Sequence, residues 1–149
     1  GKFRPSVSLN LWIGLMRART ELNAVVHTHS PYATAFSVAY QPIPVITETM
    51  ADWFGQPVQV TRYLSVEDPE FPTLPVEVMG NGYAVLLGNH GPITVGKTLE
   101  HALERAVTLE EAARTYSIAR TIGAPVTLTE EQARASFDYY HNRYGQKKS

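Results

Sequence analysis

The sequence predicts an α/β domain. Two segments, 8–19 and 98–122, have the apolar spacing of helices, and between them lie short apolar runs typical of strands, at 24–29 and 83–87. With 149 residues, 44% of them hydrophobic and 18% charged, the chain has the size and composition of a folded protein that buries a core. We therefore expect a single domain over residues 1–149, in which the long segment 98–122 is the main helix backing a sheet.

The first 40 residues are predicted to form a helix, a strand and a second helix. Residues 8–19 place apolar side chains at helical spacing and arginines in the last turn, which is typical of an amphipathic helix. The short apolar strand over 24–29, which ends in the two histidines, comes next. Ser30 is a candidate N-cap and Pro31 a candidate first helical position, so we expect the second helix to continue over 32–40.

The middle of the chain is predicted to hold two strands and an exposed connection. Residues 45–47 and 57–63 are typical of strands, and the turn-prone stretch between them contains Glu48 and Asp52. We therefore expect these two acids on or near a loop. Residues 65–75 contain three prolines and several acids, so this segment is expected to be an exposed connection rather than a continuous helix.

The C-terminal half is predicted to contain a hairpin followed by two helices. Residues 83–87 and 92–95 form apolar runs on either side of the turn sequence 89–91. After the long helix, Thr129 is followed three residues later by Gln132, a spacing typical of a capping box at the start of a last helix.

Three histidines are candidate metal ligands. Side chains alternate across a strand, so His27 and His29, at the end of the strand over 24–29, point to the same face and can share one metal ion. His90 stands where another apolar strand enters a glycine turn. Three imidazoles at two strand ends suit a catalytic metal that keeps an open coordination position.

Composition excludes several other classes of function. The net charge of −1 and the lack of a basic cluster argue against a nucleic-acid partner. The absence of cysteine excludes disulfides, a thiolate nucleophile and cysteine-ligated zinc. No apolar run approaches the roughly 20 residues that span a bilayer, and the first residues do not resemble a signal peptide. We expect no membrane partner and a cytoplasmic location.

Residues 23–38, 41–45 and 84–116 resemble the class II aldolase/adducin family, which includes fuculose-phosphate aldolase, ribulose-phosphate 4-epimerase and methylthioribulose-phosphate dehydratase. The resemblance implies a three-layer α/β/α domain around a largely antiparallel sheet. It implies a divalent metal held by His27, His29 and His90, with zinc expected and manganese, cobalt, iron or nickel as alternatives. It also implies a homotetramer with active sites between subunits.

The chain is expected to be the C-terminal portion of this family domain. Members of the family have preceding strands and helices that supply a glycine-asparagine loop and a second polar loop for a substrate phosphate. The chain is either a fragment, completed by another chain, or a protein that has lost much of its substrate pocket. We favour the fragment, because a sheet that lacks several strands would expose an edge that proteins usually cover.

The resemblance assigns two serines to substrate binding. Ser6 matches a phosphate-binding serine of the aldolases, and Val7 replaces a second one. Ser8 stands where the aldolases have an acid that acts as base and metal ligand. A serine hydroxyl cannot replace that carboxylate as a base near pH 7. The alternative for Ser8 is the structural role of a helix N-cap.

Three further residues are candidates for proton transfer. Glu48 corresponds to an aldolase tyrosine that a neighbouring subunit donates, and Asp52 matches the acid/base aspartate of the epimerases. Tyr144 resembles a tyrosine of the aldolase C-terminal tail that reaches the active site. The alternative for the two acids is a solvated loop. Glu110 is expected on a solvated helix face, together with the acids at 104 and 111. His101 is expected at the surface, and His141 is expected to be a packing residue rather than a site residue.

Together these features predict a divalent-metal-dependent lyase of carbohydrate metabolism. Aldol cleavage, decarboxylation and dehydration all suit a metal that stabilises an enediolate of a small hydroxy-carbonyl, sugar-phosphate or hydroxy-acid substrate. Three alternatives stay open: a non-catalytic, adducin-like interaction module, a non-haem iron oxygenase on the same scaffold, and a metal-dependent hydrolase. The hydrolase lacks a second histidine-rich motif in the sequence.

Overall fold

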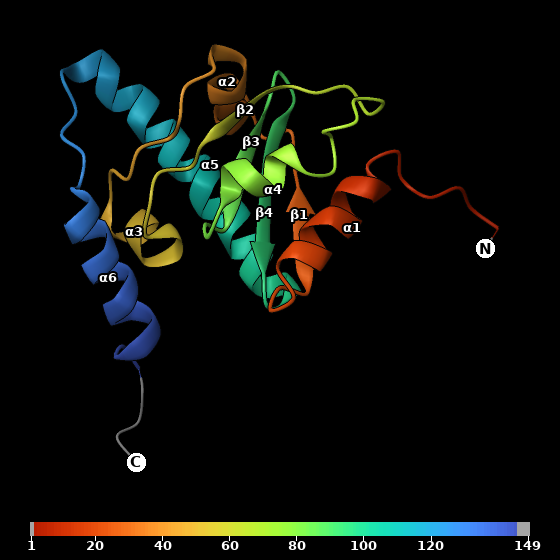
Figure 1. Ribbon diagram of the computed structural model, residues 1–149. Helices are drawn as coiled ribbons and strands as arrows, with labels where there is room; N and C mark the ends of the chain where they lie inside the picture. The colour runs from red at the N-terminus through yellow and green to blue at the C-terminus, as the bar shows by residue number, and fades with distance from the viewer. Residues whose placement is uncertain (1, 146–149) are drawn as a thin grey trace.

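The computed structural model describes residues 2–145, and within them helices and strands alternate along the chain (Figure 1). The helices are α1 (Leu9–Ala18), α2 (Pro31–Ala39), α3 (Glu48–Phe54), α4 (Leu74–Met79), α5 (Leu99–Ile122) and α6 (Glu130–Asn142). The strands are β1 (Ala24–His27), β2 (Val60–Tyr63), β3 (Ala84–Gly88) and β4 (Gly91–Gly96). In residues 2–145, each helix is too short or too polar to span a bilayer.

The strands form one sheet in the order β1-β4-β3-β2. β4 is antiparallel to both of its neighbours, whereas β2 and β3 run parallel, so the sheet is largely antiparallel, as predicted. His27 of β1 is paired with Ile93 of β4. The end of β1 therefore lies beside the turn that joins β3 to β4.

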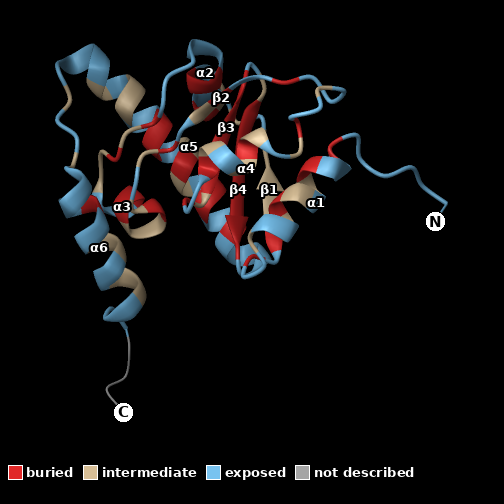
Figure 2. Cartoon of the chain, in the orientation of Figure 1, coloured by how far each residue is buried: buried red, intermediate tan, exposed pale blue. Residues whose placement is uncertain are grey.

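Helices cover both faces of the sheet. Along β3, Ala84 and Leu86 enter one core cluster with residues of α2, α3, α5 and α6, while Val85 and Leu87 enter a second cluster with residues of α1 and α4. Because side chains alternate across a strand, this division places β3 in the middle of three layers. Figure 2 shows β3 and β4 as buried strands between the helices. The predicted three-layer α/β/α fold is confirmed.

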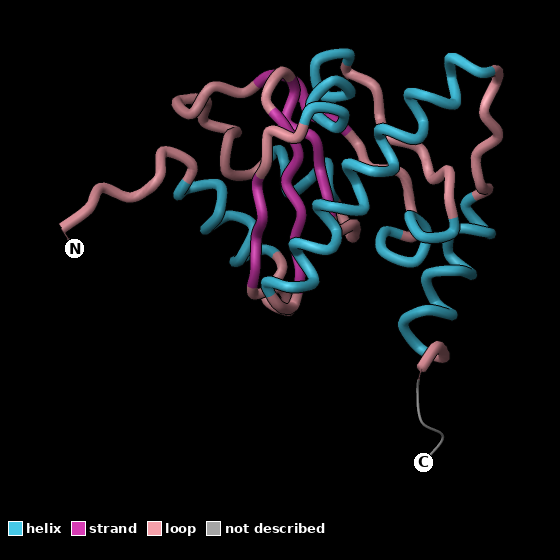
Figure 3. Tube along the Cα trace, turned by 180° about the vertical axis from the view of Figure 1, so that it is seen from behind, coloured by secondary structure: helices cyan, strands magenta, loops and turns pink. Residues whose placement is uncertain are grey.

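The two C-terminal helices both begin at a threonine cap, and the sequence predicts the second of these caps. Thr98 caps α5 by accepting a hydrogen bond from the His101 backbone N–H, and α5 crosses one face of the sheet (Figure 3). At α6, Thr129 and Gln132 form both hydrogen bonds of the predicted capping box.

The middle of the chain differs from the prediction. The stretch expected to be a loop around Glu48 and Asp52 is helix α3, and the strand expected over 45–47 does not form. Thr47 caps this helix by accepting a hydrogen bond from the Met50 backbone N–H at 3.2 Å. Burial of one helix face, with Met50, Ala51 and Phe54, outweighs the turn-forming residues. The connection over 65–75 is not wholly exposed, because Phe71 is 2% exposed in the core.

Candidate metal centre

The three predicted ligands converge at one end of the sheet. His27 is the last residue of β1, His29 follows two residues later, and His90 lies in the turn between β3 and β4. The antiparallel pairing of β1 with β4 brings that turn beside the end of β1. The hairpin thus joins ligands that are 63 residues apart in the sequence.

The three imidazoles are close enough to share one ion. The ring centre of His27 lies 4.8 Å from that of His29 and 4.7 Å from that of His90, and the last two are 5.0 Å apart. One ligand nitrogen of each ring lies within 4.8 Å of those of the others. His29 is exposed, and the other two rings are partly buried. The cluster therefore has one side open to an incoming molecule.

The backbone fixes the orientation of one imidazole. The Nδ1–H of His27 donates a hydrogen bond to the Pro92 carbonyl oxygen at 3.0 Å. This bond leaves the lone pair of His27 Nε2 directed at the cluster, where His90 Nε2 lies 3.2 Å away. Metal-binding histidines commonly have their second nitrogen held in this way.

The donor set fits a zinc-like divalent cation. Two nitrogens at about 2.0–2.1 Å from one tetrahedral zinc lie roughly 3.3 Å from each other. The 3.2 Å separation of the Nε2 atoms of His27 and His90 agrees with this value. Within residues 2–145, the cluster contains three imidazoles and no carboxylate. Imidazole donors suit zinc, copper, iron and nickel better than magnesium or calcium.

The protonation of the cluster favours metal binding. Burial lowers the pKa of His27 and of His90, and the neighbouring imidazoles add to this effect. Only the neutral imidazole offers a lone pair to a cation. The lowered pKa values of His27 and His90 therefore favour the neutral form of these two rings, which is the form that binds a metal.

Close packing sets the shape of the turn that carries His90. Asn89 has a left-handed backbone, with φ of 56°, and its side-chain oxygen accepts a hydrogen bond from the Tyr40 hydroxyl. At Gly91, a Cβ atom would lie 2.5 Å from the Thr28 carbonyl oxygen and 3.2 Å from the His29 ring. A glycine is needed here because the chain around His29 passes so close to the turn.

The helix after the histidine pair is capped by a distant glutamate. Ser30 occupies the N-cap position of α2, as predicted, but its side chain makes no capping bond. The Glu110 carboxylate instead accepts hydrogen bonds from the backbone N–H groups of Tyr32 and Ala33, at 2.9 and 2.8 Å. The expectation that Glu110 only faces solvent is wrong, because this carboxylate compensates the free N–H groups of α2.

The two predicted substrate serines lie at the start of α1. Ser8 is buried and occupies the N-cap position, but its hydroxyl makes no capping bond; its backbone N–H donates to Ser6 Oγ at 3.2 Å. Trp12 lies one turn further along α1, and its ring centre is 5.9 Å from that of His27. Residues one turn apart share a helix face, so this end of α1 approaches the histidine cluster.

Glu48, Asp52 and Tyr144 do not join the cluster within this chain. Glu48 borders a cavity against α6, and Asp52 accepts a hydrogen bond from the Ser136 hydroxyl of α6 at 2.7 Å. Tyr144 follows α6, is 61% exposed, and stacks on Tyr140 with 5.7 Å between ring centres. Figure 1 shows α3 and α6 on the side of the molecule away from β1 and α1.

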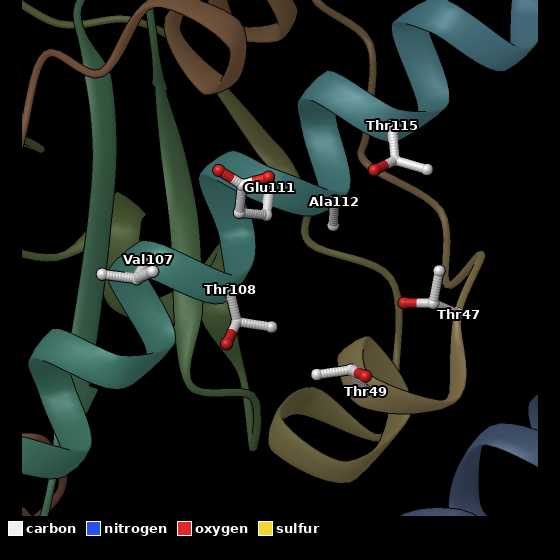
Figure 4. Close-up of a pocket in the computed structure, with 7 residues that line it drawn as sticks. All are labelled: Thr47, Thr49, Val107, Thr108, Glu111, Ala112 and Thr115. Carbon is white, nitrogen blue, oxygen red and sulfur yellow. The ribbon is translucent and has the colours of Figure 1, made fainter.

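A second cavity, of about 280 Å³, lies between the start of α3 and the middle of α5. Figure 4 shows its hydroxyl-rich lining, with Thr47 and Thr49 facing Thr108 and Thr115. Glu111 and two apolar residues of α5 complete the lining, and none of the three clustered histidines contributes to it. This cavity is therefore separate from the candidate metal centre.

Sequence reasoning missed three residues that support the cluster: Trp12, Tyr40 and Pro92. The role of Pro92 depends on strand register, since its carbonyl lies beside His27 only once β1 is paired with β4. Neither strand has a pattern that indicates this pairing, because β4 is buried at every position and β1 does not alternate. The contacts of Trp12 and Tyr40 with the site likewise have no signal in the sequence.

The chain is similar to known proteins in sequence and in fold. Residues 1–117 match the family described as class II aldolase and adducin N-terminal domain. An L-fuculose 1-phosphate aldolase has a TM-score of 0.89 and 26% identity over 94% of this chain, which spans only 66% of that protein. The L-fuculose-1-phosphate aldolase from Thermus thermophilus has a TM-score of 0.70 and 27% identity over 86% of this chain and 70% of its own. The Escherichia coli protein YgbL, a candidate aldolase/epimerase/decarboxylase, has a TM-score of 0.77 and 27% identity over 90% of this chain and 66% of its own. The chain belongs to the class II aldolase and adducin family.

Proposed function

We propose that this chain carries the metal centre of a divalent-metal-dependent lyase that acts on a small hydroxy-carbonyl, sugar-phosphate or hydroxy-acid substrate. The observation that carries the proposal is the convergence of His27, His29 and His90, with the Pro92 carbonyl holding His27 in its binding tautomer. The similar proteins named as L-fuculose 1-phosphate aldolases support carbon–carbon bond cleavage of a sugar phosphate as one candidate reaction.

The chemistry of the donor set suits this reaction class. Neutral imidazoles leave a bound divalent cation, with zinc as the first candidate, its full charge, and such a cation polarises a substrate carbonyl as a Lewis acid. The exposed side of the cluster at His29 admits the substrate. The Pro92 carbonyl keeps the Nε2 lone pair of His27 available to the cation, while its Nδ1 keeps the proton.

The start of α1 is the proposed contact for the substrate. Ser8 lies one turn from Trp12, which packs against His27, and Ser6 Oγ accepts a hydrogen bond from the Ser8 backbone N–H. The hydroxyls of Ser6 and Ser8 are suited to donate hydrogen bonds to phosphate or hydroxyl oxygens of a substrate held beside the cluster. Because a serine hydroxyl is a poor base near neutral pH, the proton must be moved by another group.

We assign proton transfer to α3 of a neighbouring subunit. Glu48 and Asp52 lie on α3, away from the cluster of their own chain, and Tyr144 lies beyond α6 on the same side. In a homotetramer with sites between subunits, these groups would serve the cluster of the next copy. A cytoplasmic location and a role in carbohydrate metabolism remain part of this proposal.

The metal is tested first. We expect the purified protein to hold about one divalent ion per chain by elemental analysis, and His27→Ala or His90→Ala to lose it with an unchanged circular dichroism spectrum. His101→Ala is the matched control, because this exposed histidine of α5 lies outside the cluster. If both cluster variants keep a stoichiometric metal, or if the native protein holds none, the proposal of a metal-dependent lyase is wrong. A non-catalytic interaction module is then favoured.

The subunit arrangement is tested by mixing inactive variants. Glu48→Gln is expected to lower turnover of a sugar-phosphate or hydroxy-acid substrate more than Ser8→Ala does. If α3 serves a neighbour, subunits with His90→Ala and subunits with Glu48→Gln should regain activity when they are unfolded and refolded together. Each variant refolded alone is the control. No gain in the mixture, or equally small effects of the Glu48 and Ser8 substitutions, places the base elsewhere.

A further inference from the structure

A buried arginine lies at the end of the sheet opposite the histidine cluster. Arg105 of α5 is 4% exposed, and its guanidinium lies 3.8 Å from the ring centre of Tyr83. Its Nη1 donates to the Val95 carbonyl at 2.8 Å and its Nε to the Trp53 carbonyl at 3.2 Å. Within residues 2–145, no carboxylate is hydrogen-bonded to it. The positive charge of Arg105 is therefore buried against neutral groups.

Such burial is costly, which makes the surroundings of Arg105 informative. A buried charge without an ionic partner is strongly destabilising, and proteins normally pair it. Burial lowers the pKa of Arg105 to about 10, which leaves the group charged at neutral pH. The two carbonyls and the Tyr83 ring compensate part of the cost. The two carbonyls accept hydrogen bonds from Nε and Nη1 of Arg105, and Nη2 has no hydrogen-bond partner within residues 2–145.

Arg105 opens into a cavity lined by basic groups. The cavity has a volume of about 320 Å³, which is at the lower end of the roughly 300–1,000 Å³ of ligand pockets. Lys97, His101 and His141 line it together with Arg105, and Asn142 adds an amide. Two aromatic rings complete the wall, and no acid lines it. Asp52, which is not among the lining residues, acts electrostatically on His141 and accepts a hydrogen bond from the Ser136 hydroxyl.

The cavity is distinct from the candidate metal centre. His90 precedes β4 and Lys97 follows it, so the two sites lie at opposite ends of that strand. Seven residues of extended chain separate these positions by about 20 Å. An ion in the cavity therefore cannot contact the histidine cluster.

We propose that this cavity is a binding site for a small phosphate-type oxyanion, either free phosphate or the phosphoryl group of a metabolite. The oxyanion serves as the missing counter-ion of Arg105. The guanidinium Nη2, the Lys97 ammonium and the Asn142 amide supply donors, and His101 and His141 border the same space. Arginine is the side chain best suited to phosphate because its planar donors match two oxygens.

Titration calorimetry on the metal-free full chain tests the site with inorganic phosphate, with glycerol phosphate as a phosphomonoester and with chloride as a control anion. We expect one saturable phosphate site that chloride does not occupy. Lys97→Gln and His101→Gln, both at exposed positions, should each weaken the phosphate Kd about tenfold, the effect of losing one charge-assisted hydrogen bond. Binding of glycerol phosphate as well identifies a phosphoryl group as the ligand, and binding of phosphate alone identifies the free ion.

The matched control is Arg120→Gln, an exposed cation of the same helix about 22 Å further along it. This variant should bind phosphate like the native chain, as should His90→Ala at the histidine cluster. The proposal is overturned by the absence of saturable binding, by equal weakening in Arg120→Gln, or by loss of binding in His90→Ala.

Discussion

Replacing Gly91 with alanine should disturb the candidate metal centre without touching a ligand. The new Cβ would lie 2.5 Å from the Thr28 carbonyl oxygen and 3.2 Å from the His29 ring. The first contact is with backbone, which moves less readily than a flexible side chain. Overpacking of this kind costs about 1–3 kcal/mol of unfolding free energy. Because Thr28 lies between two ligands, we also expect the metal Kd to rise by about 10–100-fold, as when a group supporting a ligand is lost.

Urea unfolding of the metal-free protein measures the first effect, and competition with a chelating dye measures the second. Gly123→Ala is the matched control, because a Cβ at Gly123 meets nothing within 4 Å. This control should stay within about 0.5 kcal/mol of the native protein. If Gly91→Ala is as stable as Gly123→Ala and binds metal with the native Kd, the close approach of Thr28 to the turn does not hold the ligands in place.

Three other predictions concern supporting groups. Tyr40→Phe removes the hydroxyl that donates a hydrogen bond to Asn89. The free energy of unfolding should fall by about 1 kcal/mol, and the metal Kd should rise. An unchanged metal Kd would show that this hydrogen bond does not support the metal centre. Glu110→Ala removes the carboxylate that caps α2. The free energy of unfolding, measured by urea denaturation, should fall by about 1 kcal/mol. Glu111→Ala is the control and should leave this free energy unchanged. For His141, burial lowers the pKa, and the charges of Arg105 and His101 add to the shift. The unfolded chain then binds more protons, so stability is retained above about pH 6.5 and decreases as the pH falls below it. A His141→Gln variant should show a smaller decrease between pH 7 and 5.

Local signals in the sequence predict most of the fold. The capping box at Thr129 forms as expected, and the apolar runs around residues 89–91 form the predicted hairpin. These features depend on residues close together in the chain. The prediction was wrong for α3, where turn-forming residues concealed the helical spacing of Met50 and Phe54.

The candidate site, like the fold, has one part that local sequence signals predict and another part that they do not. The ligands were predicted because a strand places His27 and His29 on one face, and that signal is local. The hydrogen bond that the Tyr32 backbone N–H donates to the Glu110 carboxylate joins residues 78 positions apart. The burial of Arg105 against Val95 and Tyr83 depends equally on how α5 packs on the sheet. Single-sequence patterns contain no information about such pairs, because the partner is chosen by tertiary packing.

The placement of the ligands around β4 implies that the metal cradle is formed before the metal binds. All residues of β4 are buried, all four residues of β1 pair with it, and the Pro92 carbonyl holds His27 in place. The core on either side of the sheet supplies the folding free energy, unlike a small zinc domain that unfolds without its ion. Removing the metal with a chelator should therefore leave the circular dichroism spectrum unchanged. The melting temperature should fall only by the amount that mass action predicts from the metal Kd. Loss of secondary structure on chelation would show instead that the histidine cluster is held together by the ion and not by β4.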